Sequence, residues 1–263
     1  IRDSQGKRSA IKPVTFYVMS SNDDAGLKAG QYWTSMDAFP TPKYTDFFLL
    51  SDGNGGRSVS MAPSSAAEGD AAAATSYKVD PADPIEGNGG ANLPPGIGGT
   101  IHCGPLEQQD IDNSGRTDFL LFDLPASDEE LVLTGEMTAE LYVSSDAKDT
   151  DFMVRISDVY NDDAGTVRLL QDNAVRMRWR EGGLEPVYMD GADTVYKVQM
   201  SLWSTSYVLA PGHQLRVSVQ SSNSPRFSVN AQNGILLADP KYPGDNVVAI
   251  NTLHHSAQYP SKI

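Results

Sequence analysis

The segment Leu131–Arg180 determines the fold, and its clearest part is Glu136–Ser144, with the sequence EMTAELYVS. Apolar and polar side chains alternate through this part, and the alternation returns in 152–157 and in 175–180. Successive side chains of a strand point to opposite faces, so a period of two fits a sheet with one buried face. Segments rich in Asp, Asn and Gly separate the runs and permit tight reversals. The segment therefore predicts a half-buried antiparallel sheet.

The later half of the chain continues this pattern. Residues 196–202 and 214–220 alternate in the same way, and Pro211-Gly212 marks the turn between them. We count about eight usable strands and no convincing amphipathic helix, with turn signals at intervals typical of a sandwich or jelly roll. The sequence therefore predicts an all-β fold, a jelly-roll β-sandwich.

Pro13–Met19 is a strand of a different kind. It is a nearly continuous apolar run, which is typical of strands buried on both faces, as in a parallel α/β sheet. One such strand without its βαβ neighbours cannot build a domain. We therefore expect Pro13–Met19 to belong to a sheet whose other strands lie elsewhere.

Two glycine-rich segments interrupt the strands. Ser51–Ala74 is rich in Gly, Ser and Ala, and it predicts a mobile surface loop. Gly87–Gly99 holds six glycines and two prolines around Asn92, Leu93 and Pro94. A loop of this composition can bring its backbone close to another surface.

Composition limits the classes of partner. The 263 residues carry a formal net charge of −14, which argues against nucleic acid or an anionic membrane as a partner. Hydrophobic residues make up 40%, enough for a sizeable core. No apolar run approaches the ~20 residues of a membrane-spanning helix. The single Cys103 excludes an internal disulfide and leaves the compartment open. A start at Ile1 without Met fits a mature protein or a fragment of a longer one.

The sequence offers no catalytic residue of its own. Serine hydrolases of the α/β class carry their nucleophile in Gly-x-Ser-x-Gly, and the nearest string, at 56–60, lacks the second glycine. The four histidines lack partners for a metal or catalytic site, so we expect structural roles for them. Arg176, Arg178 and Arg180 could bind an anion, but in so acidic a protein we expect them to pair with carboxylates.

Asp110, Asp112 and Ser114 are the candidate metal ligands. Their spacing resembles the first half of an EF-hand calcium loop, with glycine at the sixth position. The twelfth position is Leu121 instead of the bidentate Glu, and no helices flank the segment. We therefore favour a solvated acidic turn and keep calcium as the alternative.

Short stretches in the same order over nearly the whole chain match a known family. They are 13–19, 77–84, 89–90 with 104–108, 141–152, 175–180, 211–217, 221–227, 230–234 and 259–261. Together they resemble the C-terminal portion of the cocaine esterase, X-prolyl dipeptidyl peptidase and α-amino acid ester hydrolase (CocE/NonD) family of serine hydrolases.

The resemblance implies a domain arrangement. Family members join an α/β-hydrolase domain, which holds Ser, Asp and His, to a cap and a C-terminal jelly roll of the galactose-binding-like type. Residues 1–43 then resemble the terminal segment of a hydrolase domain with a linker, and residues 44–263 resemble the jelly roll. The triad would lie upstream of Ile1. The loop before Gly104-Pro105 faces the active site in the family, so Asn92, Leu93 and Pro94 are the implied substrate-binding residues.

Two functional hypotheses follow. In the first, the chain is the non-catalytic part of a serine hydrolase for small ester or peptide substrates, and its partner is a catalytic domain in the same parent chain or a companion chain. In the second, it is a free-standing jelly-roll carbohydrate-binding module, with or without calcium, that uses Trp33, Trp203 or Tyr207 as a sugar platform. No cofactor other than calcium is expected.

Overall fold

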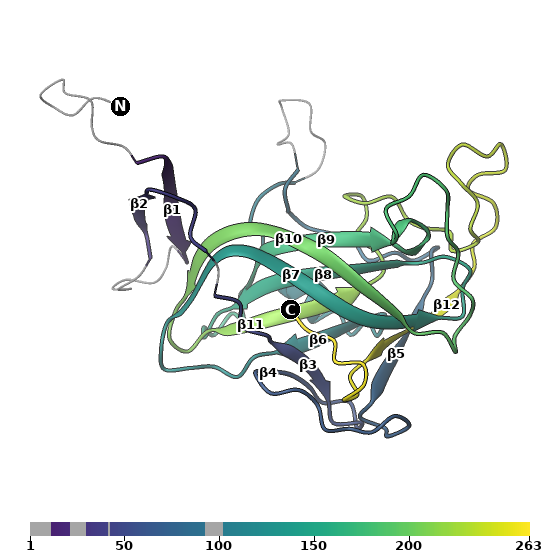
Figure 1. Cartoon of the computed structure of the whole chain (residues 1–263), viewed down its shortest axis with the longest axis horizontal. Helices are drawn as coiled ribbons and strands as arrows, with labels where there is room; N and C mark the ends of the chain where they lie inside the picture. Colours follow the sequence, from purple (N-terminus) through teal and green to yellow (C-terminus); the bar gives the residue numbers. More distant parts are fainter. Residues whose placement is uncertain (1–11, 22–29, 42, 93–101) are drawn as a thin grey trace, which may run out of the picture.

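The computed structural model describes residues 12–21, 30–41, 43–92 and 102–263. Within these residues the chain forms twelve β-strands, one short helix α1 (Gln109–Asp112) and one 3₁₀ turn η1 (Met177–Trp179). The strands make two six-stranded sheets that lie over one another, and β10 and β7 cross in front of β9, β8 and β11 (Figure 1). The expected all-β sandwich is confirmed. No helix of the described chain is long and apolar enough to cross a membrane.

The strands of the two sheets come from all parts of the chain. In order across the first sheet they are β2 (Tyr32–Met36), β1 (Val14–Ser20), β10 (Tyr196–Leu209), β7 (Leu131–Ser145), β12 (Ala249–His254) and β5 (Ala74–Val79). In order across the second they are β3 (Phe48–Ser51), β4 (Arg57–Ser60), β6 (Phe119–Asp123), β11 (Gln214–Gln220), β8 (Asp151–Val159) and β9 (Val167–Arg176).

The alternating stretch of the sequence forms the long strand β7, which pairs with β10 in antiparallel register from Val143↔Tyr196 to Leu131↔Leu209. The core lies between the sheets. Its side chains include Ala139, Leu141, Val143, Val198, Met200 and Leu202 from the first sheet, and Phe122, Val154, Ile156, Val217 and Val219 from the second. Each of the larger side chains contributes about 1.5–3 kcal/mol by its burial. The alternation thus places one face of each strand in the core.

The strand expected at 152–157 is present as β8, but the expectation that one of its faces is exposed is wrong. Residues 151–158 of β8 are buried on both faces. β8 lies between β11 and β9, and the segment that carries α1 covers its outer face, where Arg155 pairs with Asp112. A periodic pattern cannot reveal a polar face that is buried by ion pairing.

The expected strand over 175–180 is also wrong, because β9 ends at Arg176 and Met177–Trp179 turns as a 3₁₀ helix. Buried acids hold the reversal: Arg176 Nε lies 2.8 Å from an Asp151 oxygen. Arg178 Nε lies 3.3 Å from Asp149. Arg180 Nη2 lies 3.5 Å from Glu181 Oε1. The expected pairing of these arginines with carboxylates is therefore confirmed for all three.

The hairpin of β1 and β2 is only lightly joined to the sandwich. The two strands pair in antiparallel register, but β1 contacts β10 through just two parallel pairs, Met19↔Tyr207 and Ser20↔Val208. Within β1 only Val18 is fully buried. The expectation that the sheet of β1 continues elsewhere stays a prediction. The segment expected as a mobile loop, 51–74, contains the paired strand β4.

Candidate functional site

The glycine-rich loop has a firmly closed base. Gly90 and Gly104 exchange two backbone hydrogen bonds of 2.9 Å. The Asn92 side-chain amide donates to the carbonyls of Gly89, at 2.9 Å, and of His102, at 3.0 Å. Asn92 thus helps to tie the two arms of the loop together, while Leu93 and Pro94 lie outside the described residues.

A buried ion pair forms the floor under this base. Arg226 Nη2 lies 2.9 Å from Asp172 Oδ1, and the side chains of both residues are almost fully buried. Asn223 Nδ2 donates to the other Asp172 oxygen at 3.2 Å. A Cβ on Gly90 would overlap the Arg226 guanidinium, and a Cβ on Gly87 would overlap the Asn223 amide. The loop base therefore fits its floor only because glycine stands at both positions.

Burial shifts the pKa values of the charged groups in and next to this floor. Burial raises the pKa of Asp172, and the guanidinium groups of Arg226 and Arg155 oppose the rise. Burial also lowers the pKa of Arg155, against the effect of Asp112. In the described part of the chain, Nε and Nη1 of Arg226 have no hydrogen-bond acceptor. The Arg226 guanidinium therefore lies under the loop base with two N–H donor groups that no described residue accepts.

A groove of about 390 Å³ connects the loop base to the β1–β2 hairpin. Its walls are Gly90, Ala91, Gly104 and Pro105 from the loop, residues 169–172 of β9, and Tyr17 and Met19 from β1. Two elements far apart in the sequence therefore meet at one concave surface.

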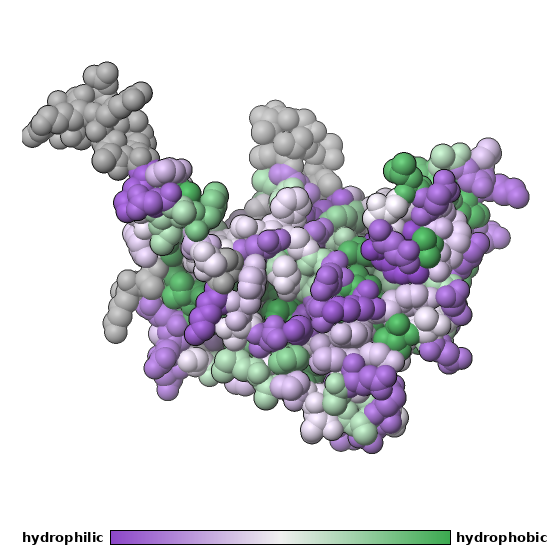
Figure 2. Space-filling model, viewed as in Figure 1, coloured by the Kyte–Doolittle hydropathy of each residue, from purple (hydrophilic) through white to green (hydrophobic). Residues whose placement is uncertain are grey.

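Exposed apolar side chains gather beside this groove. We call them the hairpin patch, which consists of Tyr17, Met19, Tyr32, Trp33, Met36, Phe39 and Tyr44. Figure 2 shows apolar residues over the hairpin at the end of the molecule where β1 and β2 lie. Part of the patch lines a second groove of about 580 Å³, whose other wall is formed by 134–136 of β7 and 204–206 of β10. Large exposed apolar patches mark interaction sites.

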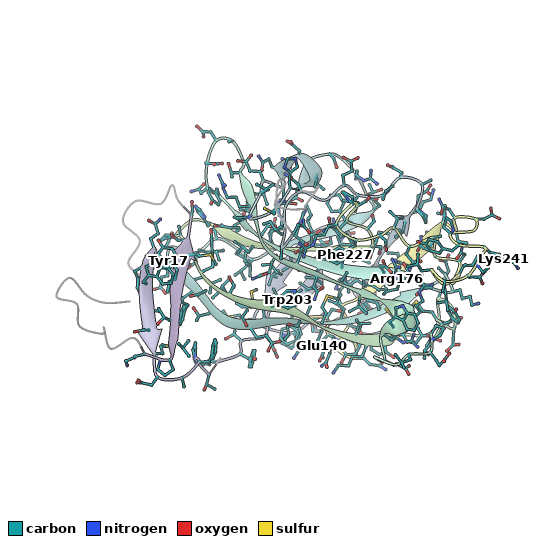
Figure 3. All side chains as sticks on the ribbon, turned by 90° about the horizontal axis from the view of Figure 1, so that it is seen from above. Tyr17, Glu140, Arg176, Trp203, Phe227 and Lys241 are labelled. Atoms are coloured by element: carbon teal, nitrogen blue, oxygen red, sulfur yellow. The ribbon has the colours of Figure 1, made fainter. Side chains whose placement is uncertain are left out.

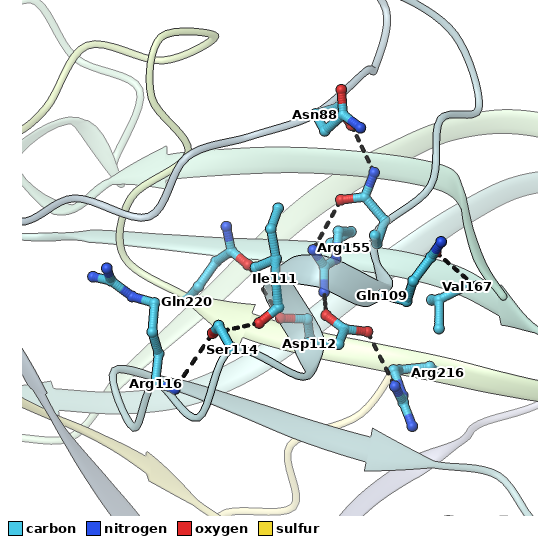
Figure 4. A network of polar contacts seen from close by, with 12 residues as sticks. Asn88, Gln109, Ile111, Asp112, Ser114, Arg116, Arg155, Val167, Arg216 and Gln220 are labelled. Atoms are coloured by element: carbon cyan, nitrogen blue, oxygen red, sulfur yellow. Dashed lines mark hydrogen bonds and ion pairs between the residues drawn. The ribbon is translucent and has the colours of Figure 1, made fainter. Parts of the chain in front are cut away.

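The candidate metal ligands do not converge. The Asp112 carboxylate ion-pairs with Arg155 and, at 3.0 Å, with Arg216 Nη1 (Figure 4). The Ser114 hydroxyl donates to the Ile111 carbonyl at 2.6 Å, and Asp110 is exposed to solvent. Among the residues that the structure describes, no three His, Cys, Asp or Glu side chains are grouped to hold a metal ion. The favoured solvated acidic turn is wrong at Asp112, whose side chain is buried by two guanidinium groups. Calcium binding stays the alternative, and a cation would have to compete with these groups.

The buried histidines have structural partners. His254 Nε2 lies 3.0 Å from the Ser144 hydroxyl, and His255 contacts the Leu49 carbonyl and the Thr75 hydroxyl. Burial lowers the pKa of both rings, in the case of His255 to about 4, so they are neutral at pH 7. His213 Nδ1 lies 2.9 Å from Asp158.

Sequence reasoning found the loop but not its floor. Gly90 and Arg226 lie in two of the stretches that carry the family resemblance, yet nothing in the sequence says that they touch. Of the aromatic residues offered as a sugar platform, Trp33 and Trp203 are exposed, but Tyr207 is wrong because it is buried. The exposure of Tyr17 and Tyr32 was missed. The apolar run at Pro13–Met19, flanked by polar residues on an otherwise acidic chain, was the signal available for this surface.

Comparisons with known proteins identify the family. The family model of the X-Pro dipeptidyl-peptidase C-terminal non-catalytic domain matches residues 9–263. Cocaine esterase from Rhodococcus sp. (strain MB1 Bresler) is 32% identical over 238 residues, which are 88% of this chain and 39% of that protein.

Solved structures show the same fold. An α-amino acid ester hydrolase superposes with a TM-score of 0.76 at 22% identity, over 99% of this chain and 42% of that one. An aminopeptidase from a marine sediment Thaumarchaeota archaeon superposes with a TM-score of 0.74 at 24% identity, over 88% of this chain and 38% of that one. The chain thus spans about two fifths of the length of the proteins it matches.

Proposed function

The chain belongs to the family of X-Pro dipeptidyl-peptidase C-terminal non-catalytic domains, found in CocE/NonD-type hydrolases, and from this we propose that it serves as the packing and substrate-mouth domain of a larger serine hydrolase. The bond cleaved would be an ester, an amide or a peptide bond of a small substrate. The alternative of a free-standing carbohydrate-binding module is not favoured, because the relatives are longer hydrolases of which this chain matches one portion.

The exposed hairpin patch is the observation that carries the packing role. Its seven apolar side chains surround a strand that has only two backbone pairs to the sandwich. Leaving this surface in water would be unfavourable, at roughly 25 cal/mol per Å² of apolar area. A catalytic domain that covers the patch would bury this area, and residues 12–43 would then pack with that domain.

The loop base supports the second part of the role. Asn92, the last described residue before Leu93 and Pro94, is fixed at the loop base by two hydrogen bonds. With its base held in place, the loop would present these three residues to the substrate in one geometry. Such positioning lowers the entropic part of a barrier, and a loop over the mouth excludes water.

Separately produced portions test the packing role. The upstream catalytic portion and this chain are mixed, and their association is followed by calorimetry, together with turnover of a p-nitrophenyl ester. We expect no turnover by this chain alone and binding that Trp33→Ser and Phe39→Ser weaken at least ten-fold. Leu184→Ser is the matched control, because Leu184 is 95% exposed. It belongs to the segment between η1 and β10, which lies at the end of the sandwich away from β1 and β2 (Figure 1).

Two results would overturn this function. Ester turnover by this chain alone that a serine-directed inhibitor abolishes would show an active site within it. If the Trp33→Ser and Phe39→Ser variants bind the upstream portion as tightly as the wild type and the Leu184→Ser control do, the patch is not the packing surface.

A further inference from the structure

A bulge in β10 contains one large aromatic side chain that is exposed to solvent. Ser201 pairs with Thr138 and Ser204 pairs with Glu136, so Leu202 and Trp203 together face the single residue Met137. Leu202 points into the core and is fully buried, while Trp203 is 60% exposed. Trp203 faces outward as the alternation of Gln199 and Ser201 requires, and the extra residue leaves two consecutive residues, Trp203 and Ser204, on the exposed side.

The backbone of Trp203 is held in an unfavourable conformation. Its φ is +66°, a region that bulky residues other than glycine rarely adopt. Such conformations persist only where the surrounding structure enforces them, and they cluster at functional positions. The positive φ accommodates the extra residue of the bulge, so the feature that points to a function outside the domain is the exposed indole itself.

Two side chains of the opposite sheet hold the bulge in place. The Asn173 amide donates to the Ser201 carbonyl at 2.7 Å, and the Gln171 amide donates to the Ser204 carbonyl at 3.2 Å. The Trp203 N–H donates to the Ser201 hydroxyl at 3.2 Å. Hydrogen bonds on both sides of Trp203 therefore fix the direction in which the indole leaves the sheet.

The indole lies next to the surface assigned above to the catalytic domain. Ser204, the following residue, lines the groove whose other wall is the hairpin patch, as do Tyr17 and Phe39. Figure 3, which views the molecule from above, labels Trp203 between Tyr17 on β1 and Glu140 on β7. Trp203 thus extends the hairpin patch across the first sheet, along the face that polar side chains such as Glu136 and Gln199 otherwise cover.

We propose that Trp203 is a docking anchor, which inserts its indole into an apolar pocket of the upstream catalytic portion. This inference rests on the proposed function, since the occupant is the remainder of the protein, of which this chain spans about two fifths in its relatives. The pocket should have apolar walls and one hydrogen-bond acceptor for the indole N–H. Tryptophan is favoured as such an anchor because it combines a large contact area with few rotatable bonds.

Two variants of the longer protein test the anchor. Trp203→Gly removes the indole and also relieves the positive φ, so the unfolding temperature of this chain alone should stay unchanged or rise. In the longer protein, or between the separately produced portions, the same variant should weaken docking at least ten-fold. Trp203→Phe should recover part of the loss, because phenylalanine keeps the apolar contact.

Fluorescence gives a second measurement in the intact protein. The difference spectrum between wild type and Trp203→Phe should show an indole that acrylamide quenches freely in this chain alone and poorly in the longer protein. Equal quenching in both, docking within two-fold of wild type for Trp203→Gly, or a strongly lowered unfolding temperature of this chain would each overturn the anchor. If the portions associate through the hairpin patch and Trp203 has no effect, only this inference fails. If they do not associate, the proposed function itself fails.

Discussion

Gly90 lies directly against the guanidinium of Arg226, so close that any side chain at this position would overlap it. The contact joins the base of the glycine-rich loop to a buried ion pair, because Arg226 in turn contacts Asp172 on β9. The placement of the loop base thus depends on a position without a side chain.

We expect Gly90→Ala to shift the loop base. Its φ of +98° and the overlap with Arg226 both oppose the added methyl group. Strain at such a backbone position costs about 1–3 kcal/mol, and the overlap adds to it. In the longer protein, the displaced loop should raise KM more than it lowers kcat. Unfolding by urea and steady-state ester kinetics measure the two effects.

Gly104→Ala is the matched control for that substitution. Gly104 is the bridge partner of Gly90 and has a similar φ of +95°, but a Cβ there would meet no heavy atom within 4 Å. Gly104→Ala should therefore lower the free energy of unfolding only by the backbone strain at its positive φ. If both variants change stability and KM equally, the contact with Arg226 has no role in placing the loop.

The buried pair of Asp149 and Arg178 should be important for stability only as a pair. The side chains are 0% and 4% exposed, and Asp149 also accepts hydrogen bonds from the Arg178 backbone and from Asn230. Removal of one charge leaves the other buried without compensation, which costs about 3–5 kcal/mol. We therefore expect Arg178→Met to lower the free energy of unfolding by that amount, as measured with urea.

The double variant and an exposed pair complete this experiment. Asp149→Asn combined with Arg178→Met should be less destabilised than the sum of the single variants, because no lone charge remains. The exposed pair of Lys12 and Asp37 should contribute less than about 1 kcal/mol. Strict additivity in the double variant would show that the two charges do not interact.

The sequence predicts the strands whose outer faces meet water, and it fails where those faces are buried by polar partners. β7 and β10 keep their alternation because one side of each packs in the core and the other is solvated. β8 carries the same pattern, yet Arg155 on its polar side is buried against Asp112 from a segment more than forty residues away. No local pattern contains that contact.

In the candidate site, too, the local sequence predicts the loop but not the long-range contacts beneath it. The composition of Gly87–Gly99 predicts a loop, and the family resemblance implies that the loop faces a substrate mouth, which stays a prediction. The floor of the loop depends on Arg226, Asp172 and Asn223, which come together only when β9 and the segment after β11 are adjacent. Long-range contacts of this kind require the fold.

Calcium should leave the unfolding temperature unchanged. Asp112 is the only buried carboxylate among the three candidate ligands, and it already has two guanidinium partners, Arg155 and Arg216. A cation would have to displace these contacts and would meet positive charge nearby. Thermal unfolding in calcium and in a chelator measures the effect, with Asp110→Asn as the comparison. A rise in calcium that Asp110→Asn abolishes would instead establish the site.

Acid should destabilise the fold through His255. Burial lowers the pKa of its ring to about 4, whereas the unfolded chain has the ordinary histidine value near 6.5. Between these values the unfolded state binds more protons, so the contribution of His255 to stability is complete above pH 6.5 and is lost as the pH falls toward 4. The loss from this residue should be about 3 kcal/mol.

His255→Gln should therefore show a smaller fall in the free energy of unfolding between pH 7 and pH 4 than the wild type. Asp151 and Asp172, whose pKa values burial raises, act in the opposite direction but are present in both proteins. The exposed His102, substituted as His102→Gln, is the control for the loss of a histidine at the surface. Equal slopes for wild type and His255→Gln would contradict a neutral, buried ring at this position.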